Sequence, residues 1–305
     1  MKAVRIHAYG HSDQLHVDDI PMPTPGAGEV LVRVHAVGVN PVDWKIREGL
    51  RARDMPRSFP FTAGQDFAGT VVSLGSGVQG IEASDVVYGF ASGSYAEYAA
   101  ASPSMIASKP RTVHDTTAAA LPTPGLTALQ TVRDAVQPQP EQTILIHGAA
   151  GGVGAIATQL CLARRARVIA TAASRDAGYL RGLGVAEVVD YRAARFEDRA
   201  RQVDAVIDLV GGDALTRSFA VLRTGGVVAT TVGPLDPAEI TRRGVRGVHI
   251  VMQKNAADLE ELARLIDDGT IAPRPVHTMQ LVEAGAAQDL LQTGHPPDKL
   301  VLAVV

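Results

Sequence analysis

The chain has 305 residues, of which 46% are hydrophobic and 20% charged, and its formal net charge is −3. This length is enough for two modest domains with cores of their own. The small net charge gives no argument for a nucleic acid or an anionic membrane as a partner. The single cysteine, Cys161, excludes an intrachain disulfide and a cysteine-rich zinc site. The N-terminal residues lack the apolar core of a signal peptide, and no apolar run reaches the roughly 18–20 residues of a membrane span, so we expect a cytoplasmic protein.

The first 115 residues or so predict an irregular, mostly antiparallel β domain. Short valine-rich runs are separated there by glycine, proline and aspartate, which is typical of strands joined by turns. The clearest runs cover residues 30–37, 67–74 and 85–90.

From Thr116 onward, an alanine-rich segment is followed by strands and helices in alternation. We expect strands at 143–148, 166–173, 187–191, 203–210, 226–232 and 247–252, and helices at 152–164, 175–183, 213–222 and 255–268. Alternation of this kind predicts βαβ units and a doubly wound parallel sheet. The tail, 299–305, again has a strand pattern and is expected to return to the first domain.

A glycine-rich turn directly follows the predicted strand that ends at His147. Its residues are Gly148, Ala149, Ala150, Gly151, Gly152, Val153 and Gly154. Small residues let the backbone approach a pyrophosphate closely, and the N-terminal amides of the next helix then meet its anionic oxygens. The strand–turn–helix context therefore predicts a dinucleotide site rather than an ordinary tight turn.

The residues after the next two strands indicate which dinucleotide binds. In NAD-binding folds, a carboxylate about 20 residues beyond the glycines accepts from the ribose 2′-hydroxyl. Here Ser174 and Arg175 stand at that point, and Tyr191 closes the following strand. A hydroxyl and a cation suit a 2′-phosphate, so we predict NADPH, although Arg175 is equally compatible with an ordinary exposed helix residue.

Several motifs along the chain resemble one family. Besides the glycine turn, they are residues 40–49, 64–69, 85–89, 93–98, 121–128 and 294–299. In this respect the chain is similar to the zinc-independent medium-chain dehydrogenase/reductases, and most of all to the quinone oxidoreductases related to zeta-crystallin. The resemblance implies an α/β protein with a GroES-like catalytic domain, 1–117 and 271–305, and an inserted Rossmann domain, 118–270. It also implies a homodimer or homotetramer.

The resemblance also bears on a catalytic metal. Zinc dehydrogenases of the same superfamily have a cysteine where this chain has Asn40, a His-Glu pair where it has Gln65 and Asp66, and a third ligand near Pro122 and Thr123. Only Asp66 is a plausible ligand, and a catalytic zinc normally needs three. We therefore expect no metal, and we expect the scattered histidines, His295 among them, to be surface or core residues.

Without a metal, the catalytic candidates are Asn40, Trp44 and Lys45. The Asn40 amide could donate to nicotinamide or substrate, or Asn40 could simply form the turn before Pro41. Trp44 could wall the pocket or belong to the core, and Lys45 could stabilise an enolate or lie in solvent.

Further cofactor contacts are expected elsewhere in the chain. Thr127 matches the family's contact to the nicotinamide ribose or amide, and Lys299 matches a basic residue that the family's tail sends toward the cofactor. Val210, Gly211, Thr231, Val232 and Gly233 end two parallel strands, at the edge where ligands bind in open α/β sheets.

These observations predict an NADPH-dependent reductase that transfers hydride to a quinone or an α,β-unsaturated carbonyl, because conjugation spreads the developing negative charge that zinc would otherwise stabilise. Two alternatives stay open at this point. One is a non-catalytic NADPH-binding protein, structural or RNA-binding, as among zeta-crystallin relatives. The other, disfavoured by the missing ligands, is a zinc alcohol dehydrogenase.

Overall fold

The computed structural model describes residues 1–293, 296 and 298–304, so Gly294 and His295 of the sequence predictions lie outside the described residues. The chain divides into two compact units. Unit 1 comprises Met1–Thr123, Lys254–Asp267 and Arg274–Val305, and unit 2 comprises Pro124–Gln253 and Asp268–Pro273. The predicted limits of the Rossmann domain, 118–270, differ mainly in including residues 254–267, which here belong to unit 1.

Unit 1 is built on two β-sheets. The larger has the strand order β15-β16-β3-β5-β6-β8, with β7 also paired to β3, and the smaller has the order β2-β1-β4. Every pairing in the unit is antiparallel except that of β15 with β16. The strands are β1 (Lys2–Ile6), β2 (Leu15–Asp19), β3 (Val30–Gly38), β4 (Phe61–Thr62), β5 (Asp66–Leu74), β6 (Val86–Phe90), β7 (Tyr98–Ala101), β8 (Ile106–Ser108), β15 (Val276–Gln280) and β16 (Lys299–Ala303).

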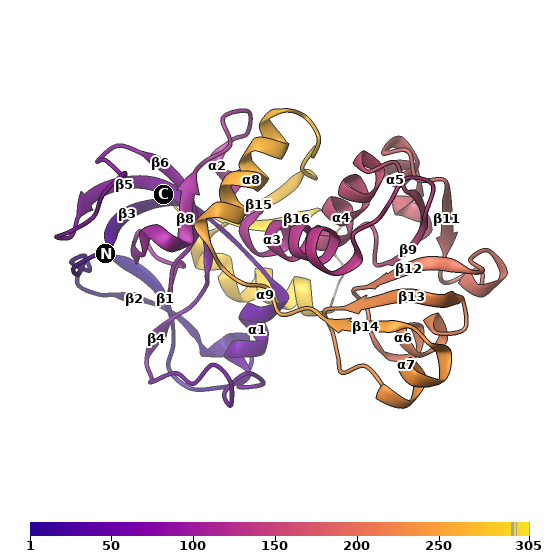
Figure 1. Ribbon diagram of the computed structural model, residues 1–305. Helices are drawn as coiled ribbons and strands as arrows, with labels where there is room; N and C mark the ends of the chain where they lie inside the picture. The colour runs from indigo at the N-terminus through magenta and orange to yellow at the C-terminus, as the bar shows by residue number, and fades with distance from the viewer. Residues whose placement is uncertain (294–295, 297, 305) are drawn as a thin grey trace. The chain divides into compact units, whose positions relative to one another are not determined.

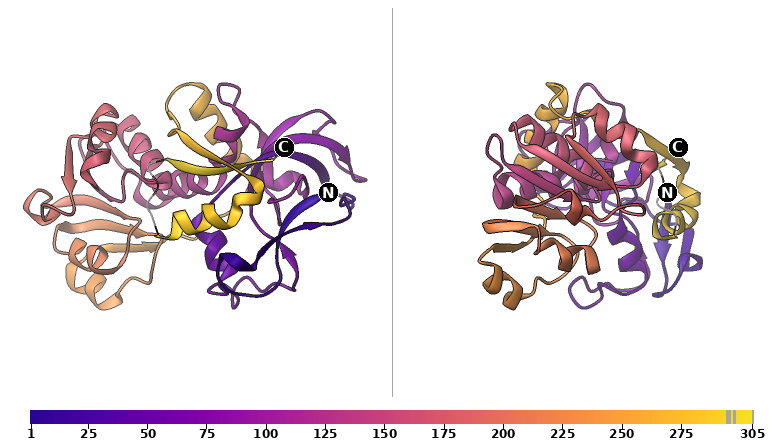
Figure 2. Two further views of the ribbon diagram at one scale, coloured as in Figure 1. Left: turned by 180° about the vertical axis from the view of Figure 1, so that it is seen from behind. Right: turned by 90° about the vertical axis from the view of Figure 1, so that its right-hand side faces the viewer.

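The helices of unit 1 come from both ends of the sequence. They are α1 (Pro41–Arg47), α2 (Asp115–Ala119), α8 (Ala256–Asp267) and α9 (Ala284–Thr293), and α3 (Pro122–Gln130) begins in this unit. The C-terminal strand β16 returns to pair with β3, with Val301 opposite Gly38 (Figures 1 and 2). The tail thus completes the N-terminal sheet, as the sequence predicts.

Unit 2 contains one six-stranded sheet in the order β11-β10-β9-β12-β13-β14, and all of its pairings are parallel. Numbered within the unit, this is the order 3-2-1-4-5-6 of the Rossmann fold. Helices α4 and α5 cover one face and α6 and α7 the other (Figure 1). The elements are β9 (Thr143–His147), α4 (Gly152–Ala163), β10 (Arg167–Ala172), α5 (Ala177–Gly182), β11 (Glu187–Asp190), β12 (Val203–Asp208), α6 (Gly212–Ser218), β13 (Leu222–Thr230), α7 (Pro237–Arg243) and β14 (Arg246–His249).

The cores follow from the sequence patterns. In β3, Val30, Val32 and Val34 are buried while Arg33 between them is exposed, which is the alternation expected of a strand. In unit 2, the strands are continuous runs such as Ile144, Leu145 and Ile146, all fully buried, because a parallel sheet is covered by helices on both faces.

Two predicted boundaries on either side of residue 220 were wrong. The helix expected at 213–222 ends at Ser218, and β13 begins at Leu222 rather than at residue 226. Leu222 pairs with Val203, and a register irregularity follows before Ala205 pairs with Val227. The pairing with β12 thus extends the strand through two residues, Gly225 and Gly226, that by themselves indicate a turn.

Candidate active site

The glycine turn joins β9 to α4 in unit 2, as predicted. Gly148 has a φ of +70°, a conformation that favours glycine. A Cβ added at Gly154 would lie 2.2 Å from the Gly148 carbonyl oxygen, closer than packed atoms allow. The backbone is therefore folded tightly on itself, and the first N–H groups of α4 have no partner within the helix, which is the arrangement that binds anions at helix N-termini.

His147 braces the strand directly beneath this turn. Its Nδ1 lies 2.9 Å from Thr171 Oγ1, and its Nε2 lies 2.8 Å from Ser218 Oγ. Because the Ser218 hydroxyl donates to the Ala214 carbonyl, it accepts from His147 Nε2–H, and Nδ1 accepts from Thr171. Burial lowers the pKa of His147 to about 4, so the ring is neutral.

The residues predicted for the adenosine end follow β10 and β11, which are parallel neighbours. Ser174 and Arg175 are exposed, and the Arg175 guanidinium lies 3.7 Å from the Asp176 carboxylate. Tyr191 is 52% exposed, with the Arg192 guanidinium 5.5 Å from its ring centre. The two strand ends thus present a hydroxyl, cations and an aromatic face at one edge of the sheet.

A buried carboxylate that the sequence reading missed shapes the next strand ends. Asp208 accepts hydrogen bonds from the backbone of Val210 and Gly211, at 3.3 and 3.0 Å, and from the Thr230 hydroxyl at 2.8 Å. Thr230 Oγ1 in turn accepts from Val232 N–H at 3.2 Å. Asp208 and Thr230 therefore fix both loops predicted to meet the nicotinamide, and they end β12 two residues earlier than expected.

The remaining predicted residues of these loops and of α3 are placed as follows. Val210 and Val232 are exposed, Gly211 is buried, and Thr231 and Gly233 are partly buried. Thr127 is only 9% exposed, and its carbonyl accepts from the Thr131 hydroxyl at 2.6 Å.

In unit 1, four residues from distant parts of the chain form a buried polar cluster. Asp66 accepts from Asn40 Nδ2 at 2.8 Å, and from the Thr123 hydroxyl and backbone at 2.6 and 2.9 Å. The Lys299 ammonium donates to Asn40 Oδ1 at 2.9 Å and to the Val39 carbonyl. Asn40 thus has its amide engaged at both ends within the unit, and Lys299 lies beside it.

Asp43, in the first turn of α1, extends this cluster. Its Oδ2 accepts from Asn40 N–H at 2.7 Å and from the Tyr95 hydroxyl at 3.2 Å, whereas Oδ1 is buried without a hydrogen-bond partner in the described structure. Burial, reinforced by the charge of Asp66, raises the pKa of Asp43 to about 7. Burial also raises the pKa of Asp66 and lowers that of Lys299, while their opposite charges act against these shifts.

Trp44 and Lys45, the other catalytic candidates, follow Asp43 on α1. Both are partly buried, and the Lys45 ammonium lies 5.6 Å from the centre of the Trp44 ring. Their catalytic roles stay predictions.

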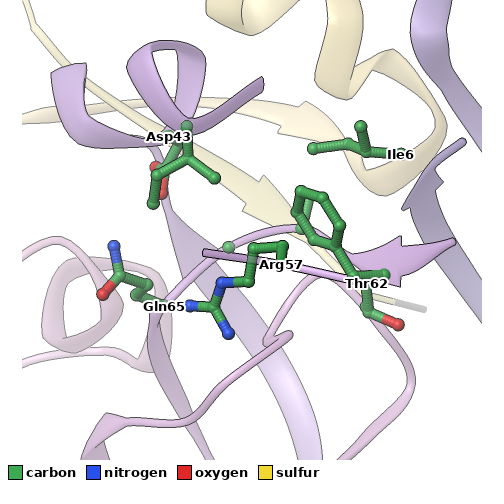
Figure 3. Close-up of a pocket in the computed structure, with 9 residues that line it drawn as sticks. Ile6, Asp43, Arg57, Thr62 and Gln65 are labelled. Carbon is green, nitrogen blue, oxygen red and sulfur yellow. The ribbon is translucent and has the colours of Figure 1, made fainter. Parts of the chain in front are cut away.

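A small pocket in unit 1 lies between α1, β1 and the segment around β4 (Figure 3). Figure 3 shows Asp43, Arg57 and Gln65 grouped on one side of it. The Arg57 guanidinium donates to Ser92 Oγ at 2.9 Å. The lining residues are Ile6, Asp43, Ile46, Arg57, Phe61, Thr62, Ala63, Gly64 and Gln65.

Gln65 is 5% exposed, and its Oε1 accepts from the Lys254 ammonium. Lys254 also lies 4.9 Å from the centre of the Phe90 ring, and burial lowers its pKa. No sequence pattern indicated this role of Lys254, which is 189 residues away from Gln65.

The donor chemistry of the cluster suits hydrogen bonding better than metal binding. Asn40, Gln65 and Thr123 offer amide and hydroxyl groups, and Asp66 is already engaged in three hydrogen bonds. Within the part of the chain that the structure describes, no group of three or more His, Cys, Asp or Glu residues could hold a metal ion. The expectation of a metal-free site remains a prediction.

Family models match both units. The alcohol dehydrogenase GroES-like domain matches residues 26–111, and a model described as zinc-binding dehydrogenase matches residues 183–302. Together with the Rossmann strand order and the returning C-terminal strand, these matches define a medium-chain dehydrogenase/reductase.

Relatives narrow this class. A chloroplast envelope quinone oxidoreductase homolog from Arabidopsis thaliana is 32% identical over 99% of this chain and 98% of its own length. An NADPH-dependent alkenal/one oxidoreductase from the same plant is 30% identical over 99% of this chain and 79% of its own. The chain belongs to the quinone oxidoreductase family.

Solved structures agree with this assignment. The quinone oxidoreductase from Coxiella burnetii matches with a TM-score of 0.93 and 34% identity, covering 100% of this chain and 99% of its own. The Escherichia coli quinone oxidoreductase, solved in complex with NADPH, matches with a TM-score of 0.91 and 26% identity, covering 100% of both chains. In the described part of this chain, no helix combines the length and apolarity needed to span a bilayer.

Proposed function

We propose that this protein is an NADPH-dependent reductase of quinones or α,β-unsaturated carbonyls that works without a metal. The observation that carries the proposal is the glycine turn at the carboxyl edge of a 3-2-1-4-5-6 parallel sheet, where a side chain at Gly154 would collide with the backbone. The quinone oxidoreductase and alkenal/one oxidoreductase relatives supply the class of acceptor.

The residues of unit 2 fit NADPH. The N–H groups at the start of α4 would hold the pyrophosphate, Ser174 and Arg175 the 2′-phosphate, and Tyr191 the adenine. The loops fixed by Asp208 and Thr230 would hold the carboxamide, with Thr127 at the nicotinamide ribose. When bound, NADPH supplies the hydride, and the protein contributes orientation and electrostatics.

The residues of unit 1 act on the acceptor. Lys299 and Asp66 each form a hydrogen bond with the Asn40 amide. We therefore propose that Lys299 and Asp66 fix the orientation of the Asn40 side chain and do not contact the acceptor directly. Trp44 is proposed to line one side of the acceptor site. Lys45 is proposed to add positive charge near the developing oxyanion. Proposed partners are limited to small acceptors and a second copy of the chain, as a homodimer or homotetramer, in the cytoplasm.

The experiment is an acceptor screen with purified protein. We expect the absorbance of reduced nicotinamide to fall when 9,10-phenanthrenequinone or a small enone is added, with NADPH preferred over NADH. Turnover should persist after dialysis against a chelator, and metal analysis should find no stoichiometric zinc. NADPH binding without turnover of any acceptor in a broad panel would refute the catalytic proposal, and loss of turnover on chelation would refute its metal-free part.

A further inference from the structure

The pocket of unit 1 contains a donor group that the cluster around Asn40 does not use. Gln65 is 5% exposed and lines the pocket, and its Oε1 is taken by the Lys254 ammonium. Among the described residues, its Nε2 group has no hydrogen-bond acceptor, and this nitrogen is accessible rather than fully buried. Gln65 thus offers an unused donor on a side chain that lines the pocket.

Lys254 determines which end of the Gln65 amide faces the pocket. An ammonium has only donors, so Gln65 must present its oxygen to Lys254, and its NH2 group is directed away. Asn40 illustrates the same logic, since its oxygen accepts from Lys299 and its nitrogen donates to Asp66. The difference is that the Gln65 nitrogen has no such partner in the part of the chain that the structure describes.

The surroundings of Lys254 act on its charge in opposite directions. Burial lowers its pKa and the Arg57 charge adds to this, whereas the carboxylates of Asp66 and Asp43 favour the charged form. The Phe90 ring covers the ammonium at 4.9 Å, a distance at which a cation and an aromatic face attract each other. A fixed N–H donor with a cation one hydrogen bond behind it is the arrangement that stabilises a developing oxyanion.

We infer that Gln65 is a catalytic residue that donates its Nε2–H to the acceptor's carbonyl oxygen, and that Lys254 is a positioning residue acting through Gln65. The inference rests on the proposed function. Hydride from NADPH forms a C–H bond at the acceptor carbon and leaves NADP⁺. The displaced π electrons move to the carbonyl oxygen, which becomes negatively charged. The Gln65 amide stabilises this oxyanion by a hydrogen bond, and a proton from solvent completes the reduced product.

The first test compares acceptors in Gln65→Met, which keeps side-chain volume and removes the donor. The kcat for a small enone is expected to fall about 10²-fold, the usual effect of losing one oxyanion donor. The kcat for 9,10-phenanthrenequinone is expected to fall no more than about tenfold, because conjugation spreads its charge over two oxygens. NADPH affinity, measured by nicotinamide fluorescence, should not change.

Two further variants separate chemistry from folding. Gln288→Met is the matched control, because Gln288 is also buried in unit 1 but accepts a hydrogen bond from Arg47 and does not line the pocket. This variant should leave the ratio of the enone kcat to the quinone kcat unchanged. If Gln65→Met fails to fold, Gln65→Glu keeps the acceptor for Lys254 and still removes the donor. An unchanged ratio in a folded Gln65 variant would overturn the inference.

A double-mutant cycle tests Lys254. Lys254→Met alone should lower the enone kcat about tenfold, and Gln65→Met/Lys254→Met should be no slower than Gln65→Met. Additive losses would show that Lys254 does not act through Gln65.

A binding readout is independent of turnover. In the NADP⁺-saturated protein, the pKa of bound p-nitrophenol should be about one unit lower in the wild type than in Gln65→Met, because the donor stabilises the phenolate oxygen. The absorbance of the phenolate measures this pKa. Equal ionisation in the two proteins would contradict the inference. Failure of the wild type to reduce any acceptor would instead count against the proposed function.

Discussion

The glycine turn of unit 2 and the polar cluster of unit 1 are built in opposite ways. The turn is a continuous stretch of backbone, 148–154, whose shape requires glycine at Gly148, where φ is positive, and at Gly154, where a Cβ would collide with the backbone. The cluster consists of side chains from Asn40, Asp66, Thr123 and Lys299, which lie up to 259 residues apart. The first can be recognised as a motif, whereas the second exists only after β16 has paired with β3.

This difference predicts how each region fails. The glycine turn should be damaged when a side chain is added where the backbone is tightly packed. The polar cluster should be damaged when one partner is removed, because another charged group is then buried without its counter-charge. The following predictions test this contrast, from the largest expected effect to the smallest.

Loss of the Lys299 charge should be the most damaging change. Lys299→Met removes the ammonium that offsets the buried Asp43 and Asp66, so we expect a loss of about 3 kcal/mol in the free energy of unfolding. Urea unfolding measures this value. Lys2→Met, at an exposed ion pair, is the control and should leave the midpoint unchanged. Adding Asp66→Asn to Lys299→Met should recover stability, and no recovery would contradict the charge argument.

The two units should respond oppositely to pH. The His147 pKa is depressed to about 4, so the unfolded chain binds the proton first and unit 2 loses stability as pH falls from 6.5 toward 4, by up to about 3 kcal/mol. The Asp43 pKa is raised to about 7, so its contribution is present below pH 3.8 and is lost as pH rises toward 7.

Unfolding curves at several pH values separate these contributions. Relative to wild type, His147→Gln should flatten the loss of stability on acidification, and Asp43→Asn should flatten the loss on raising the pH. Parallel curves for wild type and both variants would show that neither group titrates differently in the folded protein.

Adding one methyl group should distinguish two glycines of unit 2. Gly154→Ala places a Cβ 2.2 Å from the Gly148 oxygen and should cost about 1–3 kcal/mol and weaken NADPH binding at least tenfold. Gly178→Ala should stabilise α5 by up to about 1 kcal/mol, because among the described residues nothing beyond the adjoining helix backbone lies within 4 Å of the added Cβ. Calorimetry and fluorescence titration would measure both, and equal behaviour of the two variants would contradict a steric origin.

Cofactor choice should depend on one exposed cation. Arg175→Glu is expected to lower the preference for NADPH over NADH about tenfold, because a charge-assisted hydrogen bond to the 2′-phosphate becomes a repulsion. The ratio of kcat/KM values measures this preference. Arg164→Glu, at another exposed arginine of unit 2, should leave the ratio as it is in the wild type; an equal change in both variants would indicate only a general effect of charge.

The sequence alone determined the fold class and the position of the glycine turn, because hydrophobic periodicity and backbone conformation are local properties that a run of residues carries wherever it lies. The role of Asn40 is predicted by resemblance alone, and it stays a prediction. The sequence did not predict the strand boundaries that depend on pairing with a neighbouring strand. The early start of β13, where it pairs with β12, is an example.

Only the tertiary structure decided what these residues touch. Asp208 was read as the middle of a strand, although its carboxylate shapes two loops. The cofactor contact of Lys299 stays a prediction, whereas its hydrogen bond to Asn40 Oδ1 could not be foreseen from the sequence. Lys254 gave no signal, because nothing near it in the chain indicates that it meets Gln65. The physical reason is that a few consecutive residues determine the local shape of the backbone. Burial and charge pairing depend instead on which distant segments pack together.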